Sequence, residues 1–505
     1  MAGSEIKAWR CENCGYVHRG PTPPESCPVC GAPAAEFREF VEPPAPPRAE
    51  ISEWRCLNCN YVHRGTRPPA ECPVCQMPAE QFEPIAAGGP GMTAARSGAP
   101  FKAVVVGAGI AGVSAAEAIR AASPGAEIAL VTSEAPPPYY RLNLTRYLAG
   151  EIGVEMLPIH ALEWYRENRI EIIAGARTEA LDLAARRISV AGRDSIAFER
   201  LVLATGAHPF IPPIPGAERD GVVTLRTGED AERILAAALR GDPVVIIGGG
   251  VLGLETAGAL ARRGANVALL EGHDWLMPRQ LDREAGLILE RHVAGMGIRL
   301  EKRAKTREIT GASRVENVLL ADGREIPARL VVLATGVRPN THLARRAGIE
   351  VNEGVVVNNH LMTSAEGVFA AGDVAEHNGV LYGTWAASQY QGSIAGMNAA
   401  GLGIVYGGQP RSNTLKVLGL DLMSIGKVEA TDGSFVVVDE KAEGRYLHFV
   451  FQDGHLVGAI LLGDISHSAD VKTAIETRLD FSGILLGSPL VDGVLAHAES
   501  TRPPA

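Results

Sequence analysis

The amino-acid sequence predicts an α/β protein: two strand–helix–strand units form a large body, a separate α+β domain follows, and two small cysteine-rich units precede it. Three observations carry this prediction. An N-terminal segment occurs twice, a glycine-rich turn follows a β-type run at two places, and β-type runs fill the last hundred residues. Alternating strands and helices are typical of a parallel sheet.

The N-terminal segment is an internal repeat. WRCENCGYVHRG matches WRCLNCNYVHRG, PPESCPVCGAPAAEF matches PPAECPVCQMPAEQF, and every cysteine recurs 45 positions later. A duplicated small domain is therefore predicted, with copy 1 at residues 5–40 and copy 2 at residues 51–85. Residues 86–100 are rich in Gly, Ala and Pro without apolar periodicity, which predicts a flexible linker.

All eight cysteines of the chain lie in this repeat. Each copy holds two Cys-x-x-Cys pairs separated by twelve residues, so that four thiolates on two turns can converge on one tetrahedral ion. Such short paired spacings in a large chain favour metal sites over disulfides. Tetrahedral sulfur geometry suits either iron or zinc. The predicted ligands are Cys11, Cys14, Cys27 and Cys30 in copy 1, and Cys56, Cys59, Cys72 and Cys75 in copy 2.

The residues around the cysteines resemble the rubredoxin-like domain found at the end of rubrerythrins. The resemblance rests on Trp9, on CENCGY at 11–16 and on CPVCG at 27–31. It implies one iron per copy, bound by four cysteines and able to pass single electrons. Copy 2 has Asn60 and Gln76 where glycines are expected, and Gln tolerates a positive φ poorly. We therefore expect the second site to differ in potential or to be purely structural.

Two glycine motifs predict dinucleotide sites in the body. In VVVGAGIAGVSAAEAI and in VVIIGGGVLGLETAGAL, glycines follow a strand and open a helix. Their missing side chains allow a tight turn and a close approach of pyrophosphate to the helix N-terminus. A glutamate ends the next strand of each unit, in position to bind a ribose hydroxyl. The predicted residues are Gly107, Gly109, Gly112 and Glu134 in the first unit and Gly248, Gly250, Gly253 and Glu271 in the second.

The second glutamate bears on the choice of nicotinamide nucleotide. The charge of Glu271 repels a 2′-phosphate, and no arginine stands immediately beside it to bind one. NADH is therefore favoured over NADPH.

Three further segments complete an ordered set of motifs, namely LVLATGAHPFIPPIPG, LVVLATGVRPN and VFAAGDVAE. Together with the glycine motifs they resemble the two-dinucleotide flavoprotein family that includes pyridine nucleotide-disulfide reductases, rubredoxin reductases and the flavin half of assimilatory nitrite reductases. The resemblance spans about residues 101–400 and implies FAD at the first site and NADH at the second. It adds to the cofactor-binding residues Thr205, Gly206, Gly336, Gly372 and Asp373.

The resemblance also implies roles at the flavin edge. Glu255 stands where relatives place a carboxylate near the nicotinamide and the flavin, and is the predicted catalytic residue. Relatives often carry a lysine after the tyrosines of PPPYYRLNLTRYLAGE, and here Arg141 or Arg146 must supply any cation. Tyr140 and Trp385 are candidates to flank the isoalloxazine, with packing in the protein core an equal alternative.

The domain limits follow from the motifs and the resemblance. Residues 101–212 and 337–401 are expected to form the FAD-binding domain, 213–336 the NAD-binding domain and 402–505 the C-terminal α+β domain. SNTLKVLGLDLMSIG and AILLGDISHSADV resemble the small C-terminal domain of the same relatives.

The distribution of cysteines narrows the activity. The body contains no cysteine, which excludes thiol chemistry next to the flavin. The sequence therefore predicts an enzyme that passes electrons from NADH through FAD to four-cysteine iron in the same chain, and on to a downstream redox protein. The alternatives are an NADH oxidase or peroxide-scavenging flavoprotein with passive zinc ribbons, and a redox-sensing interaction protein.

Charge and hydropathy exclude other classes of partner. The net charge of −10 and the absence of a Lys/Arg block argue against nucleic-acid binding. No apolar run reaches the roughly 20 residues of a membrane helix, and the N-terminus lacks a secretion signal. A cytoplasmic protein without membrane attachment is expected, and the sequence leaves its oligomeric state open.

Overall fold

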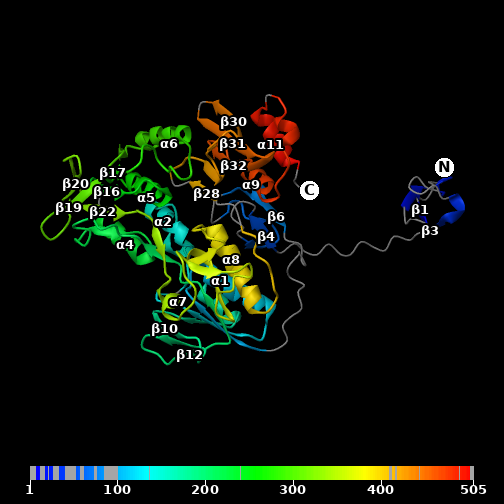
Figure 1. Cartoon of the computed structure of the whole chain (residues 1–505), viewed down its shortest axis with the longest axis horizontal. Helices are drawn as coiled ribbons and strands as arrows, with labels where there is room; N and C mark the ends of the chain where they lie inside the picture. The colour runs from blue at the N-terminus through cyan, green and yellow to red at the C-terminus, as the bar shows by residue number, and fades with distance from the viewer. Residues whose placement is uncertain are drawn as a thin grey trace. The chain divides into compact units, whose positions relative to one another are not determined.

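The computed structural model describes residues 7–11, 17–20, 22–26, 33–39, 53–56, 62–72, 77–84, 100–135, 137–238, 240–408, 412–415, 418–442, 444–487 and 489–500. The chain divides into two compact units, residues 1–52 and residues 53–505 (Figure 1). Copy 2 of the repeat thus belongs to the same unit as the body. The predicted linker lies, apart from Pro100, outside the described residues. Within the described part of the chain, no helix has the length and apolar character needed to cross a bilayer.

The two small copies share one fold. Each is a three-stranded antiparallel sheet with a 3-10 turn before its last strand, and the equivalent residues pair: Trp9 faces His18 in copy 1, as Trp54 faces His63 in copy 2. The strands are β1 (Lys7–Cys11), β2 (Val17–Gly20) and β3 (Phe37–Glu39), in the order β2-β1-β3, and β4 (Glu53–Cys56), β5 (Val62–Arg64) and β6 (Phe82–Pro84), in the order β5-β4-β6.

The first half of the body is built on a five-stranded parallel sheet whose strands are almost wholly apolar, as expected for a sheet covered on both faces. Its order is β25 (Val368–Ala370), β13 (Arg200–Leu203), β7 (Lys102–Val106), β8 (Glu127–Val131) and β9 (Ile170–Ile173). Helices α1 (Ile110–Ala122) and α8 (Trp385–Ala399) pack closely against each other. A Cβ added at Gly392 would lie 2.2 Å from the Ala111 carbonyl oxygen, so only glycine permits this approach.

The second half repeats the design. Its parallel sheet has the order β15 (Val222–Thr224), β22 (Leu330–Leu333), β16 (Pro243–Ile247), β17 (Asn266–Leu270) and β18 (Arg299–Glu301). Its helices are α4 (Gly228–Ala237), α5 (Val251–Arg262) and α6 (Arg283–Gly295). The strand carrying each glycine turn, β7 or β16, is central in its sheet. In such sheets ligands bind at the carboxyl ends of the strands.

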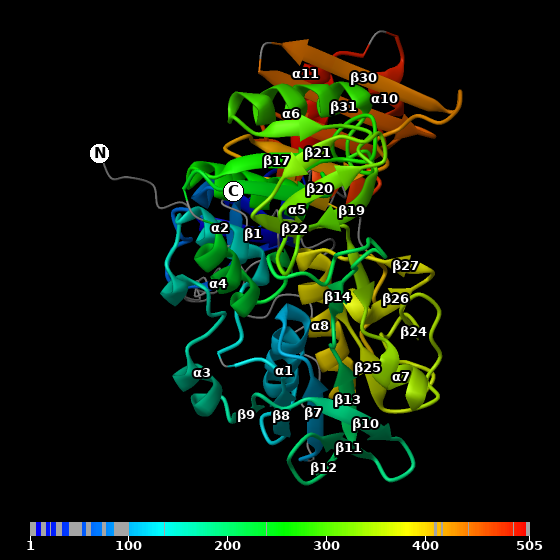
Figure 2. The same ribbon diagram turned by 90° about the vertical axis from the view of Figure 1, so that its left-hand side faces the viewer.

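Each half carries a small antiparallel sheet, β10 (Thr178–Asp182), β11 (Arg187–Val190) and β12 (Ile196–Ala197) in the first, and β19 (Thr306–Thr310), β20 (Asn317–Leu320) and β21 (Glu325–Pro327) in the second (Figure 2). A two-stranded ribbon of β14 (Ala207–Pro209) and β23 (Val337–Pro339) joins the halves. The remaining elements of the body are α2 (Leu144–Ala149), α3 (Leu162–Glu167), α7 (His342–Arg346), β24 (Val355–Val357), β26 (Ala375–His377) and β27 (Val380–Leu381).

The C-terminal domain is an antiparallel five-stranded sheet with helices, as predicted. Its order is β28 (Ser412–Leu415), β29 (Leu422–Gly426), β32 (His455–Leu462), β31 (Arg445–Gln452) and β30 (Phe435–Ala442). Helices α9 (Ser468–Glu476), α10 (Ser482–Leu485) and α11 (Val491–Glu499) follow. The α/β class expected from the sequence is therefore confirmed.

Candidate active site

A cavity of about 1390 Å³ lies between the two halves of the body and is lined by both glycine turns. A site for one small ligand typically encloses about 300–1,000 Å³. The cavity thus has room for two extended ligands. Its walls combine the carboxyl ends of the central strands with the starts of α1 and α5.

The first glycine turn forms a close-fitting cradle. Gly107 has a φ of +106°, and a Cβ there would lie 2.1 Å from the Ala204 carbonyl oxygen. A Cβ at Gly112 would lie 1.8 Å from the Gly107 carbonyl oxygen, whereas one at Gly109 would meet no atom within 4 Å. Two of the glycines thus let the turn pack, and the third leaves open space at the cavity wall.

The second turn has the same construction. Gly248 has a φ of +116°, and its Cβ would lie 2.4 Å from the Ala334 carbonyl oxygen. Gly253 packs on Gly248, and Gly250 again faces open space. The two cradles are therefore geometrically equivalent.

The helices that leave the cradles start without side-chain caps. The N-cap residues of α1 and α5 are Gly109 and Gly250, which offer no side-chain acceptor to the first N–H groups. By contrast, α4 is capped by Thr227 and α6 by Asp282. Uncapped N–H groups and the positive end of the helix dipole suit a phosphate. The residues present therefore fit one dinucleotide in each half.

Glu134 lies at the cavity wall and already has partners in the protein. Its carboxylate accepts a hydrogen bond of 2.5 Å from the Tyr139 hydroxyl and forms an ion pair with Arg141. Arg141 also donates to the backbone carbonyl of Arg226, 2.8 Å away, which connects the two halves. Burial raises the pKa of Tyr139 to about 12, so this phenol remains a hydrogen-bond donor. The ribose-binding role of Glu134 stays a prediction.

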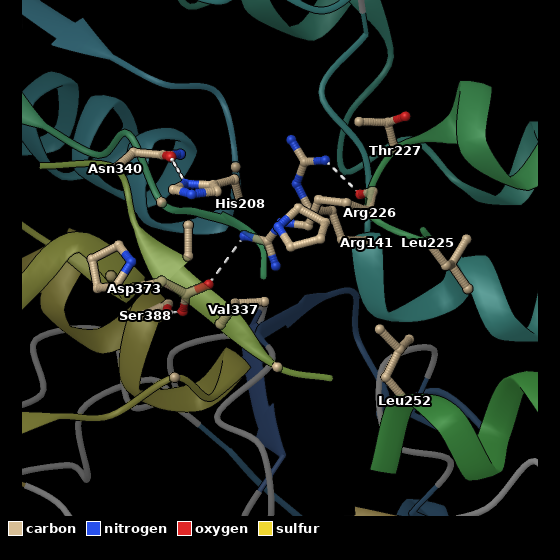
Figure 3. Close-up of a pocket in the computed structure, with 18 of the residues that line it drawn as sticks. Arg141, His208, Leu225, Arg226, Thr227, Leu252, Val337, Asn340, Asp373 and Ser388 are labelled. Carbon is tan, nitrogen blue, oxygen red and sulfur yellow. Dashed lines mark hydrogen bonds and ion pairs between the residues drawn. The ribbon is translucent and has the colours of Figure 1, made fainter. Parts of the chain in front are cut away.

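Asp373 projects into the cavity and connects the halves a second time (Figure 3). Its Oδ2 lies 3.1 Å from Nη2 of Arg226, and its Oδ1 accepts a hydrogen bond of 3.3 Å from Ser388. The preceding Gly372 has a φ of +82° and donates its N–H to Gln391. Arg226 was not among the predicted site residues; its position just beyond β15 was the only local signal.

Asn340 organises a contact within the first half, between residues 337–401 and residues 101–212, and it too was missing from the predicted site. Its amide donates to the Thr205 carbonyl at 2.7 Å, and its backbone N–H donates to the Gly206 carbonyl at 2.9 Å. Its Oδ1 lies 2.7 Å from Nδ1 of His208 (Figure 3). The GVRPN motif, which contains Asn340, is the signal in the sequence that points to it.

Glu255 lies on the first turns of α5 and faces the cavity. Burial raises the pKa of its carboxyl to about 7; the hydrogen bond of 2.8 Å from the Thr145 hydroxyl lowers it, and the charge of Glu151 raises it. A carboxyl group with this pKa can hold or release a proton near neutral pH. The structure thus gives the predicted catalytic residue a suitable acidity, and its catalytic role stays a prediction.

Glu271 is buried at the second cradle. Its carboxylate accepts the N–H of Gly249 at 2.9 Å and that of His273 at 2.8 Å. These bonds fix the orientation of the carboxylate at the end of β17, beside the glycine turn, and its ribose-binding role stays a prediction.

An apolar cluster connects copy 2 with the cavity wall. Cys56 and Cys72 are fully buried in it, together with Tyr140. The rings of Tyr140 and Trp385 lie 5.2 Å apart, and Trp385 both packs against the cluster and lines the cavity. Tyr140 is therefore packed in the core and Trp385 reaches the cavity, and their place beside the isoalloxazine stays a prediction.

The predicted residues fall into three groups. Those that line the cavity are Gly107, Gly109, Glu134, Arg141, Thr205, Gly206, Gly248, Gly250, Glu255, Glu271, Gly336, Gly372 and Asp373. Gly112 and Gly253 pack beneath the turns. Among the predicted metal ligands, the side chains of Cys56 and Cys72 are described, whereas those of Cys11, Cys14, Cys27, Cys30, Cys59 and Cys75 lie outside the described residues, as do Asn60 and Gln76.

Comparison with known proteins identifies the body. Residues 101–392 match the family model of pyridine nucleotide-disulphide oxidoreductases. The chain belongs to this family. Residues 412–479 of the oxidoreductase match the C-terminal domain of rubredoxin NAD⁺ reductases, and residues 9–38 and 54–83 match the rubredoxin-like domain of rubrerythrins. The resemblances inferred from the motifs are thus confirmed. The family implies FAD and NADH as cofactors, and the rubredoxin-like domains imply iron.

Most of the oxidoreductase chain aligns with individual enzymes. It is 34% identical to a nitrite reductase [NAD(P)H] of Bacillus subtilis, and the match covers 75% of this chain and 48% of the relative. It is 30% identical to an NADH-rubredoxin oxidoreductase of Clostridium acetobutylicum, and that match covers 76% of this chain and 96% of the relative. It therefore spans about half the length of the first of these. The crystal structure of the NADH:rubredoxin oxidoreductase from Clostridium acetobutylicum matches 79% of this chain and all of that one, with a TM-score of 0.65 and 28% identity.

Proposed function

We propose that this chain is an FAD-dependent NADH oxidoreductase that passes electrons to rubredoxin-type iron in the same chain and then to a downstream redox protein. The observation that carries the proposal is the apolar cluster in which two predicted metal ligands, Cys56 and Cys72, are buried together with Tyr140. Trp385 joins this cluster to the cavity. A relative with the same body is an NADH-rubredoxin oxidoreductase.

When bound, the groups would supply the redox chemistry: NADH would provide two electrons through FAD and leave as NAD⁺ with release of one proton, and each of two ferric centres would take up one electron. The chain binds and orients these groups. The cradles at Gly107 and Gly248 hold the pyrophosphates at the helix N-termini. Arg226 and Asp373 connect the halves around them. Glu255, which lines the cavity, can hold or release a proton there near neutral pH.

The aromatic pair has a separate task. Tyr140 is buried and Trp385 is half-buried, so the two rings keep water out of the space between the cavity and copy 2. Exclusion of water limits side reactions of reduced groups. The body contains no cysteine, so electrons have no thiol route within it. This absence also supports electron transfer to the four-cysteine domains.

Rapid kinetics test the proposal. The iron-loaded chain is mixed anaerobically with excess NADH while the flavin and iron absorption bands are followed. We expect the iron band to bleach after the flavin band, with a first-order rate that does not change when the chain is diluted tenfold. The same chain loaded with zinc is the control and should show flavin reduction only. An iron band that persists after complete flavin reduction would favour an oxidase with passive metal domains.

A further inference from the structure

Copy 2 has direct contacts with the C-terminal domain, one of them buried. Nε2 of Gln81 donates a hydrogen bond of 3.0 Å to the Ser466 carbonyl, just before α9. The Ser468 hydroxyl lies 3.7 Å from the sulfur of Met77. Ser468 is fully buried and Met77 is 1% exposed. We call residues 466–468 the seat, and Met77 and Gln81 the anchors. Figure 1 shows β4 and β6 beside this part of the C-terminal domain.

The anchors lie next to the predicted metal site. The backbone N–H of Cys72 donates to the Met77 carbonyl at 2.7 Å, and Met77 follows the predicted ligand Cys75 by two residues. Cys56 and Cys72 are buried in the same apolar cluster as Met77. Copy 2 therefore packs its described cysteines, Cys56 and Cys72, against the body.

One apolar cluster connects the seat with the cavity wall. Ile465, just before the seat, belongs with Tyr140 and Met77 to the apolar cluster. Trp385 and Leu142 pack against that cluster and line the cavity as well. The seat thus holds copy 2 on the side of the cavity where the aromatic pair stands.

The two copies differ at the anchor positions. Residues that build the small fold are shared, for example Trp9 with Trp54 and Phe37 with Phe82. In contrast, copy 1 has Ala32 where copy 2 has Met77 and Glu36 where copy 2 has Gln81.

These differences remove both anchors. An alanine lacks the length to fill the space that the methionine fills. A carboxylate has no hydrogen to donate to the Ser466 carbonyl, and burying its charge against an oxygen is unfavourable.

We propose that the anchors and the seat make copy 2 the resident acceptor of the chain, while copy 1, which lacks the anchors, meets the external redox partner. This inference rests on the proposed function. It assigns different tasks to two domains of equal fold: copy 2 takes electrons at the cavity, and copy 1 passes them on. With iron in both copies, copy 2 would receive the electrons of the hydride singly, and copy 1 would receive them from copy 2.

Hydrogen exchange of the full-length, FAD- and iron-loaded chain tests the seat without any electron flow. The test variant is Met77→Ala/Gln81→Glu, which gives copy 2 the residues that copy 1 carries. The matched control is Glu71→Gln/Glu80→Gln, two exposed positions of the same copy. Iron content should stay at the wild-type value in both, because copy 1 folds with the substituted residues.

The reporters are the amides of Ser468 and Val471, which donate to Ile465 and His467 at the start of α9. We expect these amides and those of 53–56 to exchange at least tenfold faster in the test variant and at the wild-type rate in the control. In stopped flow with NADH, all of the iron absorbance should bleach at least tenfold more slowly in the test variant, because copy 1 receives its electrons from copy 2. Equal exchange rates in the test variant and the wild type would show that the anchors do not hold copy 2 on the seat. Failure of the proposed function is a different result, since the wild-type iron would then not bleach at all.

Discussion

The carboxyl group of Glu255 gives the sharpest quantitative prediction. Its pKa of about 7, against an ordinary 4.5, follows from burial. The difference corresponds to roughly 3 kcal/mol between the charged and neutral forms. Because the folded chain favours the neutral form, this contribution to the free energy of unfolding is complete below about pH 4.5. It is lost as the pH rises to about 7.

The substitution Glu255→Gln removes the charge and keeps the shape. Relative to the wild type, the variant should therefore gain roughly 3 kcal/mol in free energy of unfolding between pH 4.5 and pH 8. Paired denaturant titrations of the two chains across this range measure the difference. Glu163→Gln, at a side chain that is 66% exposed, is the control and should change by less than about 0.5 kcal/mol.

Kinetics provide a second measurement of the same group. The rate of flavin reduction by NADH should change near pH 7 in the wild type and show no such inflection in Glu255→Gln. The Thr145 hydroxyl lowers this pKa through its hydrogen bond, so Thr145→Val should move the inflection to higher pH. A constant stability difference from pH 4.5 to 8, together with an unchanged inflection in Glu255→Gln, would refute the reasoning.

Three further predictions concern the cradles and the C-terminal domain. Gly107→Ala should lower the free energy of unfolding by more than about 4 kcal/mol, because its Cβ would lie 2.1 Å from a carbonyl oxygen; thermal melts measure this loss. Gly109→Ala should fold normally but bind FAD at least tenfold more weakly, which the flavin content of the purified variant measures. Glu271→Ala should raise the KM for NADH about tenfold without raising the KM for NADPH. An unchanged ratio of these two KM values would show that Glu271 does not bind the ribose. Burial lowers the pKa of His448, but the hydrogen bond and the charge of Asp439 outweigh burial and raise this pKa above 6.5. The stability that His448 contributes is therefore complete below pH 6.5 and is lost at higher pH. Thermal melts of His448→Gln should lack this pH dependence.

Local patterns in the sequence predicted the elements of the fold. The parallel sheets followed from apolar runs before glycine turns, and the positions of Gly107 and Gly248 follow from the need for a positive φ. The β-type runs of the last hundred residues predicted an α+β domain, whereas the antiparallel pairing of its strands came from the structure. The predicted features depend on neighbouring residues, so the sequence displays them directly.

The contacts that complete the site depend on residues far apart in the chain. Thr145 and Glu255 are 110 positions apart, and Arg226 and Asp373 are 147 apart. Gln81 reaches the seat across 385 positions. Nothing in the local sequence marks such pairs. The sequence repeat shows that copy 2 has Met77 where copy 1 has Ala32. Only the structure shows that Met77 makes a buried contact with Ser468.

An anaerobic titration with NADH tests the central claim most directly, combined with iron and zinc analysis of the same sample. One FAD takes up two electrons and two ferric centres take up one each, so the chain should consume about two equivalents of NADH and bleach both the flavin and iron bands. Consumption of a single equivalent, with an iron band that persists or with zinc in place of iron, would contradict the proposed electron path.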